Sequence, residues 1–512
     1  MSNKASSSLH ELIKSLNKSE KRYFKVFSSR HTIGEENSYI KLFDAIEKME
    51  DYDEDLLFKK FKGQALLNKF SITKARLYAN ILKSLDTFHS TSSIDAQIFR
   101  SIHSAEILYN KGLYKQAEKI LISAEKQAKK HENFNLLLEI KEKQKKLIEN
   151  ELYTDVKASD ISKMHEEEHA IIAEISRHHK LWNVKSLLFQ EINRNGKVRN
   201  EDDTKKLHQL VEQLEAVDIK SASTKSKYLY HHIQSAYYYS VNDLELSHYH
   251  LAAIIDLLED NSVLMKAQPN IYFSSLTNFI YISTKLKKYE LSQDNLLKLK
   301  ALSNPGKNID LDIKYFSSTF SLELSLLAEK GEYQKAIELV PQIEEGYRLY
   351  SGHISSLRKA YIDFQVGVIY LGMGEYNQAL SWINKILNES KIDQKQDIYC
   401  FSQLINLILH FELDNNRFLP YAISSTKRYL KNRNRIYQFE EIFLKLISQI
   451  SKTNNVFDMQ EKLQAIEGKL AELKEDPKEQ IVFEYFDFLN WVRSKLRRKT
   501  FLELKQEELR VA

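Results

Sequence analysis

The stretch Met164–His169, with the sequence MHEEEH, contains a match to the pattern H-E-x-x-H in residues His165 to His169. On a helix, this spacing places the two histidines on one face, one turn apart. In zinc peptidases such a pair binds Zn²⁺, and the glutamate beside it acts as a general base. The spacing of His165 and His169 is compatible with this chemistry.

The residues around this motif argue against a zinc enzyme. The two variable positions are Glu167 and Glu168, and charged side chains are costly to bury without partners. The sequence continues AIIAEISRHHKLW without a further H-x-x-G-x-x-H, and His178 and His179 complete a site only if the chain doubles back. Glutamates early in a helix are also favoured by the positive end of its dipole. We therefore predict a charged helix surface with no bound metal.

Other catalytic patterns are missing from the sequence. Gly372 and Gly374 in LGMGEY are spaced as in a dinucleotide-binding loop, but no predicted strand precedes them. The chain contains no G-x-x-x-x-G-K-[ST], no G-x-S-x-G and no C-x-x-C. We predict that the protein is not an enzyme and uses no cofactor.

A basic segment between Lys59 and Leu85 contains no acidic residue and is a candidate nucleic-acid interface. Its basic residues are Lys59, Lys60, Lys62, Lys69, Lys74, Arg76 and Lys83. Two helices are predicted, DEDLLFKKF and a second that begins at Ser71. The predicted core stripe of the second helix is Ile72, Leu77, Ile81 and Leu85. This pair could be a helix-turn-helix whose second helix enters the major groove. Because the connection KGQALLNK is longer than a tight turn, a solvated basic face is the alternative.

The composition indicates the elements that position these residues. Only 12 glycines and 5 prolines occur in 512 residues, although β-rich and α/β proteins need both residues for their many tight turns. We therefore predict an all-α protein. The net charge of +5 is ordinary, and the single cysteine, Cys400, is expected to be a buried small side chain. With neither a signal sequence nor an apolar run of about 18 residues, the expected location is the cytoplasm, without membrane contact.

Three stretches share one pattern of two apolar helices around a turn. They are AEILYNKGLYKQAEKILISA, LSLLAEKGEYQKAIELVPQI and GVIYLGMGEYNQALSWINKI. The repeated glycine, tyrosine and alanine are Gly112, Tyr114 and Ala117, then Gly331, Tyr333 and Ala336, then Gly374, Tyr376 and Ala379. We expect the glycine to end the first helix in a left-handed conformation. The tyrosine then wedges between the helices, and the alanine lies where they cross most closely.

Degenerate copies of this pattern extend the register. The wedge positions are Leu244, Tyr289, Tyr333, Tyr376 and Phe418, at spacings of 45, 44, 43 and 42. Asn416 occupies the glycine position of the last copy. The pattern resembles the tetratricopeptide repeat (TPR), whose usual period is about 34 residues. The resemblance implies a TPR-like α-α superhelical solenoid, with longer units than usual, in which hairpins stack because none can bury its apolar faces alone.

In TPR-like solenoids the first helix of each hairpin lines a concave groove, so the resemblance also implies candidate binding residues. Counting back from each turn, they are His232, Tyr239, Thr277, Tyr281, Lys285, Ser321, Ser325, Tyr361 and Phe364. Aromatic rings and hydroxyls suit an extended peptide or a partner helix. Ordinary helix packing is the alternative role for each of these residues.

We predict three segments along the chain. Residues 1–95 form a separate N-terminal helical module, and residues 96–450 hold the repeats, with a longer irregular connection near 190–207. Residues 451–512 form a C-terminal helical cap, in which Met459, Leu463, Ile466, Leu470 and Leu473 make one apolar stripe and IVFEYFDFLNWV forms an aromatic helix. The predicted function is a non-catalytic scaffold or adaptor that binds a peptide or partner helix in the groove. The alternative is a regulator whose N-terminal module binds nucleic acid and whose repeats sense a partner.

Overall fold

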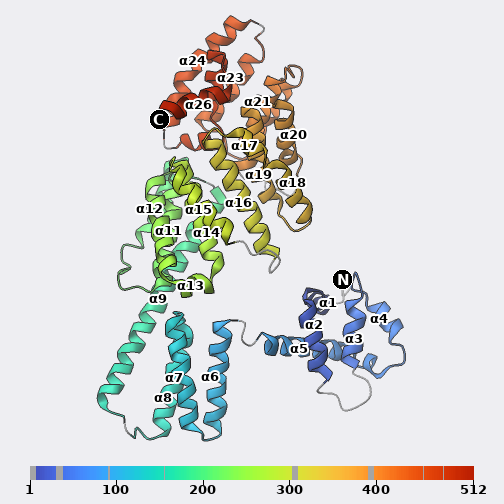
Figure 1. The fold of residues 1–512 in the computed structure, drawn as a ribbon, viewed down its shortest axis with the longest axis vertical. Coiled ribbons are helices and arrows are strands. Elements are labelled where there is room, and N and C mark those ends of the chain that lie inside the picture. Colours follow the sequence, from blue (N-terminus) through green and yellow to red (C-terminus); the bar gives the residue numbers. More distant parts are fainter. Residues whose placement is uncertain are drawn as a thin grey trace. The chain divides into compact units, whose positions relative to one another are not determined.

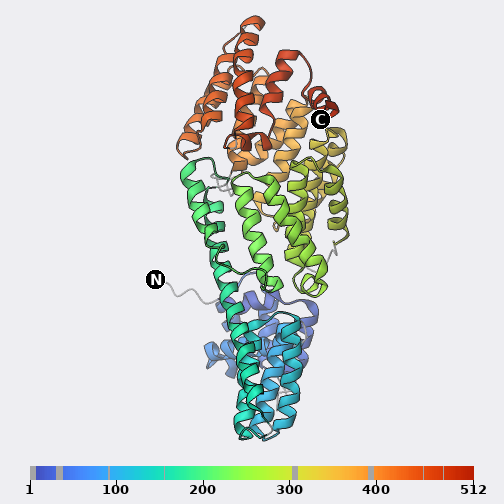
Figure 2. The ribbon, with the colours of Figure 1, turned by 90° about the vertical axis from the view of Figure 1, so that its left-hand side faces the viewer.

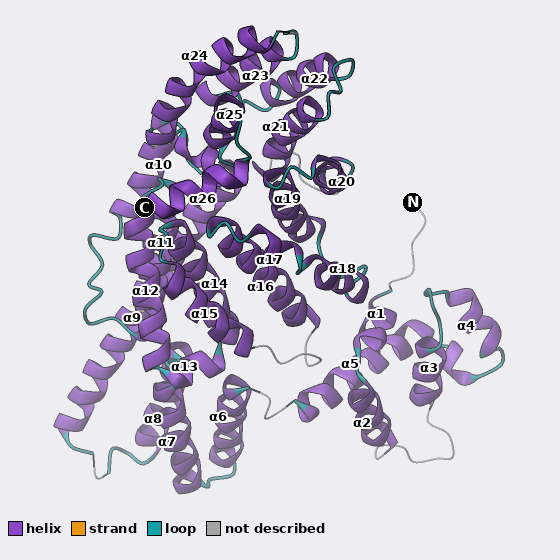
Figure 3. Ribbon diagram, turned by 45° about the horizontal axis from the view of Figure 1, so that its top comes forward, coloured by secondary structure: helices purple, strands orange, loops and turns teal. Residues whose placement is uncertain are grey.

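The structure is a computed structural model that describes residues 7–29, 38–89, 93–154, 156–195, 197–302, 309–389, 397–453, 455–476 and 478–511. All regular structure in these residues is helical, as Figure 3 shows, and no described residue lies in a strand. The predicted all-α fold is therefore confirmed. The chain forms two compact units, Met1–Ile175 and Ser176–Ala512. The segments predicted above, 1–95, 96–450 and 451–512, do not coincide with these units.

The first unit begins with five α-helices around a small core. Their bounds are α1 Ser8–Ser15, α2 Lys18–Ser29, α3 Ser38–Glu47, α4 Glu54–Lys60 and α5 Phe70–Phe88, with the 3-10 helix η1 at Ala65–Leu67. The largest fully buried side chains of this core include Phe24, Phe43 and Leu77. On α5, Ile72 was predicted to be buried but is exposed, and α5 begins at Phe70 rather than Ser71. Phe70 is buried in its place, because it shares the face of Leu77 and Ile81.

The same unit continues with three helices that pack in sequence. They are α6 Ile94–Asn110, α7 Tyr114–Lys130 and α8 Phe134–Asn150. The following helix, α9 Ala158–Asn195, continues past the boundary into the second unit. Ala117 of α7 is buried in the core of these helices, as its position in the repeat pattern predicted.

The second unit contains the repeated hairpins, which Figures 1 and 2 show as neighbouring helix pairs along the chain. The helices are α10 Glu201–Glu212, α11 Thr224–Ser240, α12 Leu244–Asp260, α13 Ser262–Ala267, α14 Pro269–Lys285, α15 Tyr289–Ala301, α16 Ile309–Glu329, α17 Tyr333–Ile337, α18 Val340–Leu349, α19 Ser356–Gly372, α20 Tyr376–Leu387, α21 Asp397–Glu412, α22 Leu419–Lys431 and α23 Gln438–Ile450. The first helices of successive hairpins, α14, α16, α19 and α21, contact one another in that order.

The turns within the hairpins have one geometry. The residue with positive φ lies two positions before the second helix, at Gly331 (71°) before α17 and at Gly374 (80°) before α20. In the degenerate copies the same conformation is taken by Asn242 (64°) and Lys287 (59°). The wedge residues therefore begin the second helices, as the register predicted.

The last repeat departs from this register. Its left-handed residue is Asp414, with φ 57°, rather than Asn416, and Phe418 is the N-cap of α22 rather than its first residue. The side chains of Asn415 and His410 are 3.0 Å apart across this turn, and the backbone N–H of Asn415 donates to the carbonyl of His410. The turn therefore closes two residues earlier, and a short non-helical stretch precedes α22.

Small residues let the helices of a hairpin approach closely. Ala336 and Ala379 are fully buried at the start of their helices. In α19, a Cβ at Gly367 would lie 2.9 Å from Ile383 of α20, and a Cβ at Gly372 would lie 2.3 Å from the Tyr333 ring. The pair Gly372 and Gly374 therefore serves helix packing and a turn, consistent with the absence of a dinucleotide-binding loop.

The connection predicted near residues 190–207 is shorter than expected. Helix α9 continues to Asn195 and α10 begins at Glu201. Asn200 caps α10, since its side chain accepts a hydrogen bond from the backbone N–H of Asp203 at 2.8 Å. The sequence between Glu191 and Asn195 contains no glycine or proline, so the helix extends to the residue before Gly196.

The C-terminal residues contribute α24 Val456–Glu475, η2 Gln480–Glu484, α25 Phe488–Arg497 and α26 Phe501–Val511. The predicted apolar stripe faces the core, where Leu463, Leu470 and Leu473 are buried. The predicted aromatic helix over residues 481–492 is wrong, because residues 485–487 are not helical. Asp487 instead caps α25 by accepting from the backbone N–H of Asn490 at 3.0 Å.

Candidate functional site

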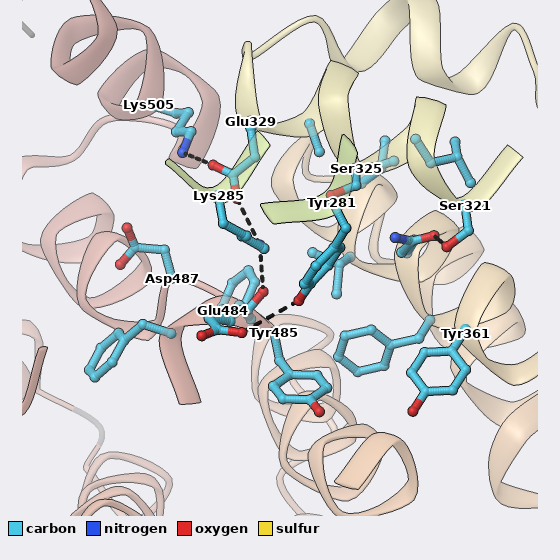
Figure 4. Close-up of a pocket in the computed structure, with 18 of the residues that line it drawn as sticks. Tyr281, Lys285, Ser321, Ser325, Glu329, Tyr361, Glu484, Tyr485, Asp487 and Lys505 are labelled. Atoms are coloured by element: carbon cyan, nitrogen blue, oxygen red, sulfur yellow. Dashed lines mark hydrogen bonds and ion pairs between the residues drawn. The ribbon is translucent and has the colours of Figure 1, made fainter. Parts of the chain in front are cut away.

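The first helices of the hairpins in the second unit line one cavity of about 440 Å³. We call the surface formed by α11, α14, α16, α19 and α21 the inner groove. Figure 4 shows side chains from several of these helices pointing into it. Seven of the residues predicted from the repeat register line this cavity: Tyr239, Tyr281, Lys285, Ser321, Ser325, Tyr361 and Phe364. The repeat spacing thus brings together side chains up to 125 positions apart (Phe364 minus Tyr239).

The other two predicted residues lie elsewhere. His232 lines a second cavity of about 250 Å³, which shares Tyr239 and Tyr281 with the first. Burial lowers the pKa of His232 to about 4, so its imidazole is neutral at pH 7. Thr277 lines neither cavity, and its hydroxyl donates to the backbone carbonyl of Phe273 within the same helix at 2.8 Å.

One wall of the groove carries a buried chain of charges. Lys285 Nζ lies 2.9 Å from one carboxylate oxygen of Glu329, and Lys505 Nζ lies 3.1 Å from the other. Burial by itself raises the pKa of Glu329, but the two ammonium groups outweigh burial and lower it to about 2. Burial would likewise lower the pKa of Lys285, but the Glu329 and Glu484 carboxylates raise it. Both groups are therefore charged at pH 7.

Phenol groups supply most of the remaining polarity. The rings of Tyr239 and Tyr281 meet edge to face, with centroids 6.2 Å apart. Burial raises the pKa of both phenols well above the usual value, so they are neutral and can donate hydrogen bonds. On the opposite wall, the Ser321 hydroxyl donates to the side-chain oxygen of Gln365 at 2.9 Å. These groups can bind the carbonyls and carboxylates of a peptide.

Several side chains that line the cavity lie outside the predicted set, among them Glu484 and Tyr485 of the C-terminal segment. The Tyr281 hydroxyl donates to the Glu484 carboxylate at 3.4 Å, and Lys197 Nζ lies 2.5 Å from its other oxygen. Burial lowers the pKa of Lys197 despite this carboxylate. The repeat register contains no information on the Lys197–Glu484 contact, because Lys197 lies in the irregular connection, Glu484 lies in the C-terminal segment, and the two are 287 positions apart.

The H-E-x-x-H motif lies on α9 and takes part in ion pairs. Its two rings meet edge to face at 4.7 Å between centroids. Lys141 Nζ is 2.7 Å from Glu167, and Lys145 Nζ is 2.7 Å from Glu168. Glu168 is therefore buried with a partner rather than exposed as the sequence suggested. In the part of the chain that the structure describes, no group of three histidine, cysteine or acidic side chains is arranged to hold a metal ion.

The basic segment of the first unit lies on α4, η1 and α5. Lys74 forms an ion pair with Glu54 and also approaches the Tyr52 hydroxyl. The other basic side chains predicted for nucleic acid are exposed, namely Lys59, Lys60, Lys62, Lys69, Arg76 and Lys83. The predicted helix pair exists, but nine residues, 61–69, separate α4 from α5.

Comparisons with known proteins assign this chain to no family. No protein-family model matches the sequence, and no curated protein matches it. Among solved structures, NprR in complex with its cognate peptide NprX is similar, with a TM-score of 0.39 and 15% identity over 66% of this chain and 94% of that one. The apo form of RapI is also similar, with a TM-score of 0.41 and 11% identity over 79% and 99%. Likeness at this level carries no functional argument.

The repeated hairpins themselves decide the class. The chain is a TPR-like helical-repeat protein. Its single cysteine, Cys400, is buried in the core, and burial raises the pKa of its thiol to about 12. Within the described ranges, no helix combines the length and apolar character needed to cross a membrane.

Proposed function

We propose that the second unit is a non-catalytic binding module that holds a peptide segment or helix of a partner protein in its inner groove. The observation that carries this proposal is the cavity of about 440 Å³ on the inner face of consecutive hairpins. Peptide-binding grooves combine apolar walls with a few placed polar groups. Here Phe364 and Tyr361 supply ring surface, while Lys285 and Tyr281 supply donors.

The lining favours binding over catalysis. None of the described residues that line the cavity is a histidine or a cysteine, and the Ser321 hydroxyl donates to an amide oxygen rather than to a general base. Glu329 is held ionised between two lysines, with a pKa of about 2, which makes it a poor proton donor or acceptor near pH 7.

A random peptide library tests this proposal on the full chain. We expect selected peptides to bind the wild type and to lose at least tenfold in affinity on Ser325→Trp, because an indole at this cavity-lining position fills the groove. Ser425→Trp is the matched control, since Ser425 is exposed on α22. Fluorescence anisotropy gives the affinities. Peptides that bind both variants equally well, or a failure to select any binder, would contradict the proposal.

A second candidate function rests on the exposure of six basic side chains on α4, the following connection and α5. We propose nucleic-acid binding as the alternative role of this surface. Its affinity for duplex DNA or RNA should fall steeply between about 50 and 200 mM salt as counterions are released. Replacing Lys59, Lys60 and Lys62 by alanine in the full chain should reduce that slope. Binding that is absent, or that does not respond to salt, would remove this alternative.

A further inference from the structure

A short segment of the chain itself occupies part of the inner groove. Residues Gln480–Glu484 form η2, and the backbone continues without helix until α25 begins at Phe488. Glu484 and Tyr485 line the cavity together with residues of α14, α16 and α19. Figure 4 shows the Glu484 carboxylate next to the Tyr281 hydroxyl, and the Tyr485 ring below both of them in this view. The groove thus already binds a peptide-like stretch in cis.

Glu484 is bound by side-chain and main-chain contacts of the kind that a separate peptide would make. Its carboxylate pairs with Lys197 Nζ at 2.5 Å and accepts from the Tyr281 hydroxyl at 3.4 Å. Its main-chain carbonyl accepts from Lys285 Nζ at 3.0 Å. Two of these three partners, Tyr281 and Lys285, belong to the first helix α14, so the hairpin array itself supplies the recognition.

Lys197 makes this position selective for an anion. Its side chain is 8% exposed, and its ion pair among the described residues is with Glu484. Its Nζ also lies 3.2 Å from the side-chain oxygen of Asn242 and 4.1 Å from the centre of the Tyr239 ring, and both of these groups are neutral. A buried cation that loses its anion is strongly destabilising. A ligand that displaces Glu484 therefore binds best when it brings its own anionic group.

The neighbouring position is selective for an aromatic ring. The Tyr485 ring stacks on Phe401, with centroids 4.1 Å apart and an interplanar angle of 26°. It also meets Phe364 edge to face at 6.1 Å. Both partners lie on first helices of hairpins, α21 and α19. A ligand that moves Tyr485 aside leaves an aromatic slot that another ring fills best.

The two cavity-facing side chains of the segment are less buried than the side chains beside them. Val482, Phe486 and Phe488 are buried in the core of the second unit, whereas Glu484 and Tyr485 are half-buried at the cavity. Exchange therefore requires the Glu484 and Tyr485 side chains to leave the cavity, while Phe486 stays in the core and Asp487 still caps α25.

We infer that the peptide ligand of the inner groove carries an acidic residue followed directly by an aromatic residue, and that it competes with Glu484 and Tyr485 for these positions. This inference rests on the proposed function, since it names the ligand of the same groove. Because of this competition, the apparent affinity of the wild type for a peptide equals the intrinsic affinity multiplied by the fraction of molecules whose groove is open.

A labelled peptide with the sequence of residues 483–487, FEYFD, tests the inference on the full chain by fluorescence anisotropy. Glu484→Gln weakens the internal occupant, so we expect this variant to bind the peptide at least tenfold more tightly than the wild type. Adding Lys197→Met should remove that gain. Glu441→Gln is the matched control because Glu441 is exposed on α23, and it should bind like the wild type.

Two altered peptides separate this inference from the proposed function. A peptide with glutamine in place of its glutamate, or alanine in place of its tyrosine, should bind at least tenfold more weakly. Equal affinity for all three peptides overturns the inference. Library peptides that respond to Ser325→Trp but lack the acidic–aromatic pair would sink it while leaving the proposed function intact. Circular dichroism checks that Glu484→Gln folds. If it does not, the affinities of the three peptides for the wild type test the inference in the same way.

Discussion

The buried charged residues at the centre of the groove are stable in the interior because opposite charges lie next to them. Lys285, Glu329 and Lys505 form one such chain, and Lys197 with Glu484 forms another. Asp363 of α19, which does not line the cavity, differs from them. Asp363 is 5% exposed, and its carboxylate accepts a hydrogen bond from the Tyr347 hydroxyl at 2.8 Å. Among the described residues, no basic side chain lies within 4 Å of this carboxylate.

Burial raises the pKa of Asp363 to about 6, against the opposing effect of the Tyr347 hydrogen bond. Since the folded state binds the proton more tightly than the unfolded state, this group lowers stability as pH rises from about 4 to 6, and the loss is complete above that range. We predict that Asp363→Asn raises the free energy of unfolding at pH 7 by about 1–3 kcal/mol. Asparagine can still accept from Tyr347.

Urea unfolding at several pH values measures this effect. The gain of Asp363→Asn should be present at pH 7 and absent near pH 4. Asp256→Asn, at an exposed position of α12, should change stability little at either pH. A gain that is independent of pH would show that packing rather than the charge of Asp363 is responsible.

At the scale of the helices, the hairpins depend on close contact at a few small residues. Gly372 ends α19 against the ring of Tyr333, the wedge residue of the preceding hairpin. The two repeats pack this closely because glycine has no side chain. This contact explains why the motif contains Gly372 in addition to the turn residue Gly374.

We predict that Gly372→Ala lowers the free energy of unfolding by about 1–3 kcal/mol, because its Cβ would lie 2.3 Å from the Tyr333 ring and the ring must move. Gly468→Ala is the matched control. No atom lies within 4 Å of a Cβ at Gly468 in α24, so it should gain about 0.5–1 kcal/mol from helix propensity. Thermal and urea unfolding compare the two. Equal effects of the two substitutions would mean that the Tyr333 contact is not restrictive.

At the scale of the molecule, charged contacts join distant ends of the second unit. Arg199, just before α10, contacts Glu440 of α23 at 2.7 Å and Glu479 at 2.5 Å. Its guanidinium carbon also lies 4.0 Å from the centre of the Tyr437 ring. Lys478 pairs with Glu201 at 3.1 Å beside this cluster. The beginning of the second unit is thereby fastened to its C-terminal helices.

We predict that Arg199→Ala destabilises the full chain by about 3–5 kcal/mol, because it leaves the Glu440 and Glu479 carboxylates buried without a cation. Arg428→Ala removes an exposed arginine of α22 and should change stability by less than about 0.5 kcal/mol. Urea unfolding of both variants measures the difference. Similar stability of the two variants would show that the Arg199 cluster does not fasten the unit.

The sequence by itself determined the repeat. The spacing of glycine, tyrosine and alanine describes contacts within one hairpin, and such local contacts depend on few residues. For this reason Gly331, Tyr333 and Ala336 have the conformations and burial that their positions predicted. The same register brought seven predicted side chains to one cavity, although their binding roles stay predictions.

Only the tertiary structure decided what lies in the groove. Glu484 and Tyr485 come from a segment that the sequence indicated as a helix, and its apolar pattern fits either a helix or an inserted loop. Lys197 meets Glu484 across 287 positions, and Arg199 meets Glu479 across 280. No repeat spacing encodes such pairs, because each joins two segments that are far apart in the sequence and meet only in the tertiary structure.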